Sequence, residues 1–308
     1  MIKRVVVVDD SAFMRSELTK MLDSDPALQV VATAENGLEA IDAVKQYQPD
    51  VVTMDINMPV MDGISSLKQI MNEVPCPVIM VSAMTHDSAD ETIEALASGA
   101  FDFFQKPSGS ISLDIAKQAD IIRQKVKTAA AAKAKHQNEP SPWKRVVQAI
   151  PSIQKLKQSM SLPRESRLAD APNIVAIGVS TGGPKTLMSI LPSIPADFFG
   201  SIIIAQHMPE KFTSAFAKRL DDICALRVKE AKDRDILQKG KIYIAPGGKH
   251  IRIGTKEDRF FTLRIEEGTN THSFAPSVDM LFRSLLEKAG NQWLGVMLTG
   301  MGGDGATA

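Results

Sequence analysis

The sequence predicts an α/β protein made of two doubly wound parallel-sheet domains joined by a linker. The first observation is that short runs, apolar on both faces, alternate with amphipathic stretches in two separate regions of the chain. Such runs are typical of parallel strands covered on both sides by crossover helices. The second is a segment rich in Lys, Pro, Ser and Ala between these regions. The third is the length of 308 residues, which suits about two domains.

The composition is that of a soluble globular protein. Hydrophobic residues make up 44% and charged residues 23% of the chain, and 36 basic residues balance 36 acidic ones, so no global field attracts nucleic acid or a membrane surface. The apolar run at residues 5–8 is too short for a signal peptide, and no window approaches a membrane span. Because the two cysteines, Cys76 and Cys224, indicate a reducing compartment, we expect a cytoplasmic protein without nucleic-acid partners or membrane insertion.

The first domain is predicted over residues 1–125, where strand and helix patterns alternate five times. Strands are expected at residues 5–8, 30–34, 51–54, 78–82 and 101–104. Helices are expected at residues 11–22, 37–47, 63–72, 89–98 and 111–126. A doubly wound sheet of this kind binds ligands at the carboxyl ends of its strands.

A basic linker is predicted over residues 126–172. It opens with an Ala/Lys stretch and continues with Pro, Ser and Lys, and between Arg123 and Arg167 only Glu139 and Glu165 oppose the many basic residues. This composition indicates an extended, partly helical connection. Residues 143–156 have an amphipathic pattern but too few apolar residues to stand alone as a helix.

The second domain is predicted over residues 173–308. Strands are expected at residues 174–179, 201–205 and 293–298, and helices at residues 185–191, 211–220 and 278–289. Ser277 suits the N-cap of the last helix. Residues 241–245 and 250–253 flank a Pro-Gly-Gly-Lys turn, which is a hairpin signal.

Polar groups end several strands expected in the first domain. They are, in chain order, Asp9 and Asp10, Asp55, Ser82 and Lys106. Three carboxylates held close together repel one another unless a hard cation binds, and oxygen ligands suit Mg²⁺. Beside Mg²⁺, Asp55 becomes a nucleophile that forms an acyl phosphate, while Lys106 and Ser82 contact the phosphoryl oxygens. Each acid taken singly is better explained as an ordinary surface charge, but their joint position at strand ends favours a phosphoacceptor site.

These motifs resemble the response-regulator receiver family across the whole first domain. The matching segments are Val-Val-Asp9-Asp10-Ser, Met54-Asp55-Ile-Asn-Met58-Pro59-Val-Met61-Asp62-Gly63, Val81-Ser82-Ala and Phe103-Phe-Gln-Lys106-Pro107. The resemblance implies a flavodoxin-like fold with phosphorylation at Asp55. It further implies Mg²⁺ bound by Asp10, Asp55 and the Asn57 carbonyl with Asp9 in support, and a switch pair of Ser82 and Phe103. A cis Lys106–Pro107 bond would point the lysine inward.

Ser180 lies in Gly178-Val-Ser180-Thr181-Gly182, between an expected strand and an expected helix. That is the context of a G-x-S-x-G nucleophile elbow, in which a sharp turn presents the hydroxyl and nearby N–H groups form an oxyanion hole. A Gly/Ser turn after a strand is more often only a turn or a phosphate cradle. The same segment comes close to a P-loop, but Pro184 breaks the spacing and removes an N–H that the cradle needs.

A serine nucleophile needs a general base. His207 follows the strand expected at residues 201–205, so a parallel sheet places it beside the Ser180 turn. Asp304, in a glycine-rich loop after another strand, suits the carboxylate that orients the imidazole, although without the other two it would be a turn residue. The order Ser-His-Asp differs from that of α/β-hydrolases, which indicates a triad on another fold. The other histidines are the fallback bases His250 and His272, and His86 and His136 outside the domain.

The second domain resembles the catalytic domain of the chemotaxis protein-glutamate methylesterase family from Asn173 to Ala306. The matching segments are Ile-Gly178-Val-Ser180-Thr181-Gly182-Gly183-Pro184, Gln206-His207-Met208-Pro209, Ala245-Pro246-Gly247-Gly248-Lys-His250 and Leu298-Thr299-Gly300-Met301-Gly302-Gly-Asp304-Gly305-Ala306. The implied roles on a Rossmann-like fold are nucleophile for Ser180, general base for His207, orienting acid for Asp304, and oxyanion-hole neighbours for Thr181 and the Met301 backbone. Because family members continue with a helix and a further strand, residues 173–308 are expected to be a C-terminally incomplete domain.

A receiver followed by this catalytic domain is the arrangement of that family. It implies a phosphorylation-activated enzyme that removes methyl groups from glutamate γ-methyl esters of chemoreceptors and deamidates receptor glutamines, with a chemotaxis histidine kinase as phosphodonor and an unphosphorylated receiver that covers Ser180. One alternative is a response regulator that binds DNA or a protein partner, which would need a basic helix-turn-helix output. The other is a catalytically inactive scaffold.

Overall fold

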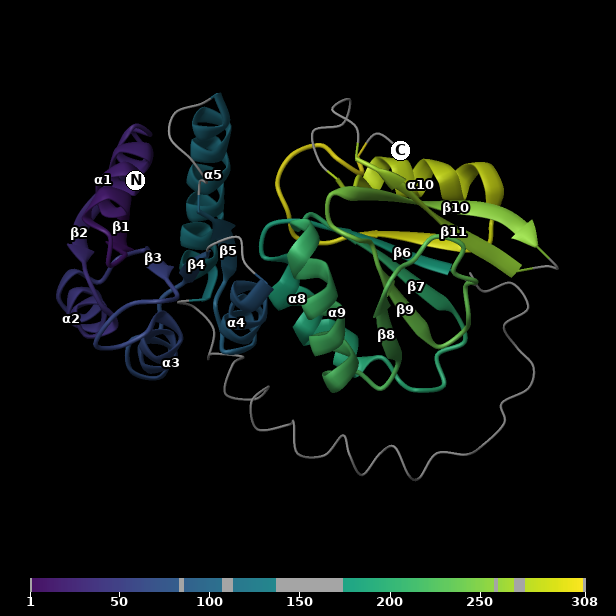
Figure 1. Cartoon of the computed structure of the whole chain (residues 1–308), viewed down its shortest axis with the longest axis horizontal. Coiled ribbons are helices and arrows are strands. Elements are labelled where there is room, and N and C mark those ends of the chain that lie inside the picture. The colour runs from purple at the N-terminus through teal and green to yellow at the C-terminus, as the bar shows by residue number, and fades with distance from the viewer. Residues whose placement is uncertain are drawn as a thin grey trace. The chain divides into compact units, whose positions relative to one another are not determined.

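The computed structural model describes residues 2–82, 86–106, 113–136, 174–257, 260–268 and 275–306. The chain divides into two compact units, Met1–Ser141 and Pro142–Ala308, each with a parallel sheet of its own (Figure 1). The amphipathic pattern at residues 143–156, Pro107 and His272 all lie outside the described residues. Within the described part of the chain, no helix is long and apolar enough to cross a membrane.

The first unit is built on a five-stranded parallel sheet with the order β2-β1-β3-β4-β5. Its strands are β1 (Lys3–Val8), β2 (Leu28–Ala34), β3 (Val51–Asp55), β4 (Val78–Ser82) and β5 (Asp102–Gln105). Its helices are α1 (Ala12–Asp23), α2 (Gly37–Tyr47), α3 (Gly63–Glu73), α4 (His86–Ala97) and α5 (Leu113–His136). The expected five repeats are confirmed, because strands apolar on both faces, such as β1 with its four fully buried valines, need a cover of helices on each side.

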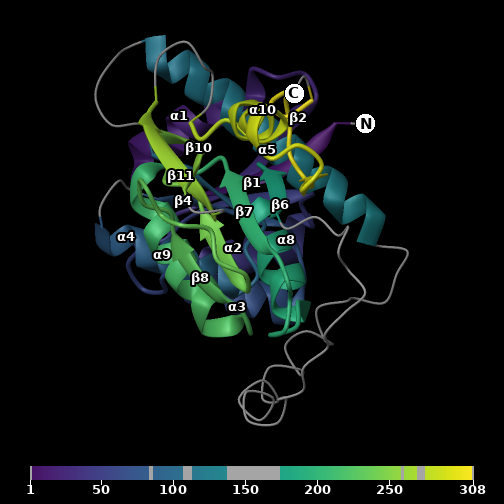
Figure 2. The same cartoon turned by 90° about the vertical axis from the view of Figure 1, so that its right-hand side faces the viewer.

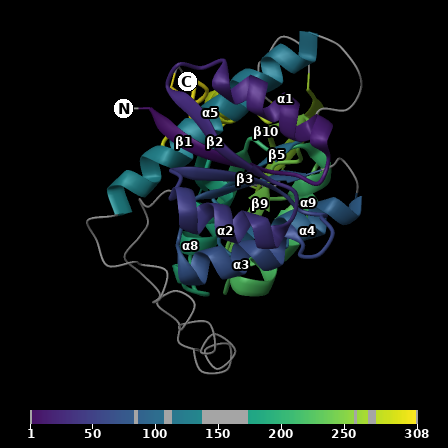
Figure 3. The ribbon, with the colours of Figure 1, turned by 90° about the vertical axis from the view of Figure 1, so that its left-hand side faces the viewer.

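Helices α1 and α5 cover one face of this sheet, and α2, α3 and α4 cover the other (Figure 3). Helix α5 continues through residues 126–136, which the composition assigns to the linker. Ala129 and Ala130 of this extension are fully buried in the same core as Ile122 and Val126. The Ala/Lys stretch is therefore helical because its small apolar face packs on the sheet, a contact that composition does not reveal.

The second unit holds another five-stranded parallel sheet, in the order β12-β6-β7-β9-β8. Its strands are β6 (Ile174–Val179), β7 (Ser201–Gln206), β8 (Arg227–Glu230), β9 (Lys241–Ile244) and β12 (Trp293–Met297). Helices α8 (Gly183–Ile190), followed by a 3₁₀ turn at Leu191–Ser193, and α9 (Glu210–Ile223) lie on one face. Helix α10 (Val278–Lys288) and an antiparallel pair, β10 (Lys249–Glu257) and β11 (Phe260–Glu267), cover the other (Figure 2).

The hairpin expected around Pro246 is wrong. Strand β9 lies inside the parallel sheet between β7 and β8, and β10 pairs with β11 instead. The turn after β9 therefore takes the chain out of the sheet, where Ile251 and Ile253 of β10 pack into the core beneath α10. The Pro-Gly-Gly-Lys segment does form a turn, but which strands pair depends on how each strand is buried within the whole sheet.

Candidate functional site

Three neighbouring strands carry the candidate catalytic residues to one edge of the second sheet. Strand β6 lies between β7 and β12 and pairs with both in parallel register. Ser180 follows β6, His207 follows β7, and Asp304 lies in the loop after β12. Because parallel strands end at the same edge, residues far apart in the sequence meet there.

The three side chains form a continuous hydrogen-bonded chain. Ser180 Oγ is 3.0 Å from His207 Nδ1, and His207 Nε2 is 2.8 Å from Asp304 Oδ2. When the ring proton is on Nε2, the imidazole donates to Asp304 and its Nδ1 accepts from the serine hydroxyl. This tautomer directs the Nδ1 lone pair at the serine proton, which is the arrangement that a general base requires.

Asp304 is held at the N-terminus of helix α10. Its Oδ2 accepts from the Val278 N–H at 2.7 Å, and its Oδ1 accepts from the Asp279 N–H at 3.0 Å and from Ser277 Oγ at 2.8 Å. Asp279 in turn accepts from the Gly305 N–H at 2.9 Å. The loop that carries Asp304 is thus fastened on both sides of the carboxylate to the positive end of a helix dipole.

These contacts determine the charge of Asp304. Burial acts to raise the pKa of this carboxyl, but the hydrogen bonds from His207, from the Asp279 and Val278 N–H groups and from Ser277 outweigh it and hold the pKa well below its usual value. Asp304 is consequently ionised at neutral pH and supplies a full negative charge beside His207 Nε2.

The turn at Ser180 is tight and is bound to the Asp304 loop. Gly182 has φ of +72°, a left-handed conformation that glycine adopts without steric cost. A Cβ on Gly300 would lie 2.8 Å from the Ser180 Cβ. The Ser180 N–H donates to the Thr299 carbonyl at 3.0 Å, so the Ser180 turn and the loop after β12 hold each other in place.

The remaining second-domain candidates lie around this centre. Thr181 follows Ser180 and is buried, and its carbonyl accepts from Thr299 Oγ1 at 2.9 Å. Met301 is half-buried in the Asp304 loop. His250 lies in β10 with 1% of its surface exposed, and its Nδ1 accepts from the Ser277 N–H at 3.2 Å. That bond makes His250 a support of the α10 N-terminus rather than a base for Ser180.

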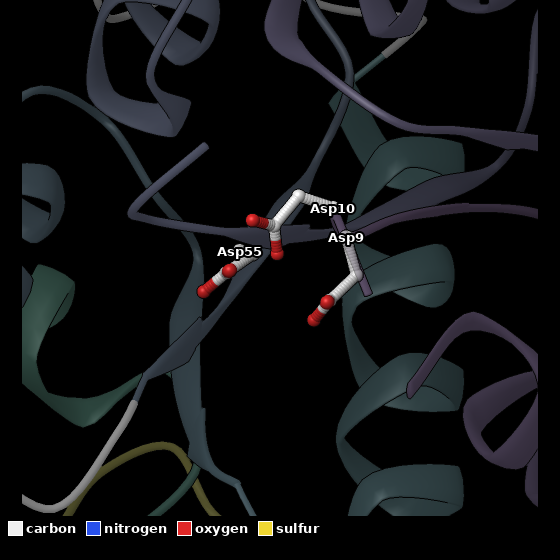
Figure 4. Close-up of side chains that lie close together, drawn as sticks. All are labelled: Asp9, Asp10 and Asp55. Carbon is white, nitrogen blue, oxygen red and sulfur yellow. The ribbon is translucent and has the colours of Figure 1, made fainter. Parts of the chain in front are cut away.

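The acidic pocket of the first unit forms where β1, β3 and β5 end. Carboxylate oxygens of Asp9, Asp10 and Asp55 lie within 4.8 Å of one another (Figure 4). Lys106 Nζ lies 2.9 Å from Asp9 Oδ2 and 2.8 Å from Asp55 Oδ2. Asp9 and Asp55 are buried while Asp10 is exposed, so the cluster opens to solvent on the side of Asp10. A set of hard oxygen donors of this kind suits Mg²⁺.

Burial and pairing act against each other in this pocket. Burial raises the pKa of Asp55 above its usual value, and the hydrogen bond and charge of Lys106 only partly offset that effect. Burial also acts to lower the pKa of Lys106, but the bonds to Asp55 and Asp9 outweigh it and leave this pKa raised. The lysine stays charged, and the two buried carboxylates share a single counter-charge that lies within contact distance of both.

The predicted switch residues lie on β4 and β5. Ser82 is buried and its Oγ is 2.8 Å from Thr92 Oγ1 of α4. Phe103 is also buried, with Lys125 Nζ 5.8 Å from its ring centroid. The Asn57 side chain points to Glu91, with its Nδ2 donating to the Glu91 carboxylate at 3.0 Å, which leaves its backbone carbonyl as the group that the resemblance assigns to the metal.

Comparison with known proteins gives two family matches and many similar proteins. Residues 5–116 match the response regulator receiver domain, and residues 175–308 match the CheB methylesterase domain. A protein-glutamate methylesterase/protein-glutamine glutaminase from Oleidesulfovibrio alaskensis is 44% identical over 98% of this chain and 84% of its own length. The chain belongs to the protein-glutamate methylesterase/protein-glutamine glutaminase family. A relative of the same name from Oceanobacillus iheyensis is 43% identical over 98% of this chain and 83% of its own length.

Two solved structures of methylesterase family domains also match. The response regulator domain of Thermotoga maritima CheB is 49% identical, covers 42% of this chain and 98% of its own, and has a TM-score of 0.40. The methylesterase catalytic domain of Thermotoga maritima CheB is 37% identical, covers 44% of this chain and 70% of its own, and has a TM-score of 0.42.

Sequence reasoning about this methylesterase family chain missed two residues that contact the triad. Ser277 was expected only as a helix cap, yet its hydroxyl also donates to Asp304. Gln206 was only part of a motif, yet its side-chain amide donates to the carbonyls of Ser180 and His207. A signal for Gln206 was present, because a polar residue at the end of an otherwise apolar strand needs partners when it is buried.

Proposed function

We propose that this chain is a phosphorylation-activated protein-glutamate methylesterase and protein-glutamine glutaminase that acts through Ser180, His207 and Asp304. The observation that carries the proposal is the unbroken hydrogen-bonded chain from Ser180 Oγ through His207 to Asp304. The chain's membership of the family supports the reaction class, and the substrates proposed are glutamate γ-methyl esters and glutamines of chemoreceptors.

The chemistry follows from the order of the three groups. His207 Nδ1 accepts the Ser180 proton as Oγ bonds to the glutamyl carbonyl carbon, and Asp304 stabilises the imidazolium that forms. The Nδ1 proton then passes to the methoxy oxygen as its bond to the carbon breaks, which releases methanol and leaves an acyl-serine. Water, deprotonated by the same nitrogen, attacks this ester, and the products are the glutamate carboxylate and restored Ser180. A glutamine follows the same course and releases ammonia.

The negative oxygen of each tetrahedral intermediate needs hydrogen-bond donors. Thr181 and the Met301 backbone are proposed to supply the surroundings of this oxyanion hole, since they lie next to Ser180 and in the Asp304 loop respectively. Donors of this type contribute about 3–4 kcal/mol to the transition state in serine hydrolases.

Labelling of the full chain with a serine-reactive phosphonate, followed by peptide mass spectrometry, tests this assignment. The expected result is a single phosphonylated serine at position 180, with labelling slowed by about 100-fold or more in His207→Ala. Label on another serine, or a His207→Ala rate equal to that of the wild type, would rule out the triad.

The first unit is proposed to be the phosphorylation switch, with Asp55 as phosphoacceptor. Mg²⁺ would be held by Asp10, Asp55 and the Asn57 carbonyl with Asp9 in support, and when bound it would neutralise the incoming phosphoryl group. The clustering of the three carboxylates supports this site. Lys106, already paired with Asp55, would move its charge to a phosphoryl oxygen, and Ser82 and Phe103 would reorient with it.

The proposed setting follows from the family. In this setting the phosphodonor is a chemotaxis histidine kinase, the substrates are methylated chemoreceptors, and the enzyme is cytoplasmic. The proposed division is a receiver at residues 1–125, a linker at 126–172 and a catalytic domain at 173–308, with the unphosphorylated receiver covering Ser180.

Acetyl phosphate with Mg²⁺ should therefore raise the rate of methanol release by the wild type and leave that of Asp55→Asn unchanged. Equal stimulation of both would remove Asp55 from the switch.

A further inference from the structure

Gln206 connects the nucleophile turn to the strand end that carries the general base. It is the last residue of β7, with 1% of its surface exposed. Its Nε2 donates to the Ser180 carbonyl at 3.0 Å and to the His207 carbonyl at 3.1 Å. Both amide hydrogens are used, and both acceptors belong to residues of the triad.

The other end of the same amide makes no hydrogen bond. Gln206 Oε1 is buried and has no hydrogen-bond partner among the described residues. It packs against Gly183 at the start of α8, where a Cβ would come within 2.0 Å of this oxygen. An orphaned buried acceptor costs on the order of 1–3 kcal/mol, and native proteins retain such a group where it serves a specific purpose.

The unpaired Oε1 helps to decide whether Gln206 only fills the core or also links the backbones at Ser180 and His207. If Gln206 served only to fill the core, an apolar side chain of similar length would fill it without the unsatisfied acceptor. The Ser180 carbonyl also accepts from the Gly183 N–H at 2.9 Å, so the turn itself does not depend on the glutamine for its fold. The backbones at the two strand ends are also joined by the His207 N–H, which donates to the Val179 carbonyl at 3.1 Å. What the amide adds is a second link, from the carbonyl of Ser180 itself to the carbonyl of His207.

We propose that Gln206 is a positioning residue for the hydrolytic reaction, which sets the separation of Ser180 Oγ and His207 Nδ1 through its two backbone hydrogen bonds. The proposal rests on the triad proposed above. The 3.0 Å contact between these atoms is the one across which the proton moves, and errors of about 1 Å in such a contact lower rates by about 100-fold.

Replacing Gln206 by Met in the full chain tests this role. The variant keeps the length of the side chain and removes both the donors and the orphaned acceptor. We expect kcat for methanol release to fall about 10- to 100-fold with KM within about twofold, while the melting temperature stays equal or rises. The rate of phosphonate labelling at Ser180 should fall in parallel with kcat.

A matched control is Ser284→Ala. Ser284 is fully buried in α10, donates to the Leu281 carbonyl at 2.7 Å and accepts from the Ile253 N–H at 2.9 Å. The substitution Ser284→Ala therefore removes a buried polar group that has two hydrogen-bond partners, neither of which belongs to the triad. This variant should lose melting temperature and keep kcat, which is the reverse of the pattern expected for Gln206→Met.

The outcomes separate this inference from the assignment of the triad. Wild-type kcat and labelling in Gln206→Met would overturn the positioning role, as would a rate loss that vanishes at temperatures where the variant is fully folded. Failure of both Gln206→Met and Gln206→Leu to fold would also overturn it, because the orphaned acceptor predicts that apolar side chains are tolerated. If the phosphonate labels a serine other than Ser180, the triad itself fails.

Discussion

At the scale of single residues, the position and charge of the Asp304 carboxylate depend on the hydrogen bonds that hold it. Its carboxylate accepts from two N–H groups of the first turn of α10 and from Ser277 Oγ, besides His207. A lone aspartate in a glycine loop gives no sign of this in the sequence. The anchoring explains how a loop containing several glycines keeps an orienting acid in place.

Ser277→Ala should lower kcat by about 10-fold with little change in KM, because Asp304 loses the hydroxyl that holds its Oδ1. Ser277 also caps α10 by accepting from the Met280 N–H at 3.3 Å, so about 1 kcal/mol of stability should be lost as well. Asn36→Ala, which removes the cap of α2, controls for that loss and should leave kcat unchanged. Ser277→Thr should keep both activity and stability, and a low kcat in Ser277→Thr would contradict the role of the hydroxyl.

The lowered pKa of Asp304 predicts a definite pH dependence of stability. A carboxyl whose folded pKa lies below its unfolded value of about 4 stabilises the fold fully above that value, and this contribution is lost as the pH falls through the folded pKa. The free-energy difference between the wild type and Asp304→Asn should therefore shrink as the pH falls below about 4. Urea unfolding at several pH values below 5 measures it, and a difference that grows as the pH falls below about 4 would refute the assignment.

At the scale of elements, parallel strands explain why the residues of both candidate sites could be grouped from the sequence. Asp9, Asp55, Ser180 and His207 each stand directly after or at the end of a run that is buried on both faces. Such runs indicate central strands, and the carboxyl ends of central parallel strands lie together at one edge of the sheet. Position in the sequence was therefore enough to group these residues.

Weakly patterned strands, the β10–β11 pairing and contacts made by packed helices could not be predicted in the same way. Strand β8 begins with the exposed Arg227 and has one fully apolar side chain, Val228, in four residues, so it carries no strong strand pattern. Strands β10 and β11 pair although the sequence between them, Asp258-Arg259, carries no Asn-Gly or similar hairpin signal. The hydrogen bond from Ser277 to Asp304 depends on where α10 packs, which is a tertiary property.

The pocket at the ends of β1 and β3 predicts an effect of charge on stability. Because burial raises the folded pKa of Asp55, its ionisation begins to oppose folding above the unfolded value of about 4, and the penalty is complete above the folded pKa. Asp55→Asn should raise the melting temperature at pH 7 by on the order of a few degrees, and the gain should disappear near pH 4.

Added Mg²⁺ should raise the melting temperature of the wild type but not of Asp55→Asn. Equal Mg²⁺ stabilisation of both would exclude Asp55 as a ligand.

At the scale of the whole molecule, two sites of different chemistry lie on two separate units of one chain. Asp55 is buried beside Lys106 in the first unit, and Ser180 is hydrogen-bonded to His207 in the second. Sequence reasoning reached both through motifs, whereas the covering of one by the other depends on contacts between units and stays a proposal. Given the chain's family membership, we propose that the hydrolytic site is the output and that phosphorylation of Asp55 controls it.

The most direct measurement is methanol release from a methylated chemoreceptor by the full chain and by Ser180→Ala, matched in concentration and in melting temperature. The wild type should release methanol at a steady rate, and Ser180→Ala should be slower by at least about 1,000-fold, because loss of the nucleophile removes the acyl-enzyme route. Ser284→Ala, which removes a hydroxyl bonded to Ile253 and Leu281 rather than to the triad, should release methanol at the wild-type rate. Methanol release by Ser180→Ala at the rate of the wild type would contradict the account.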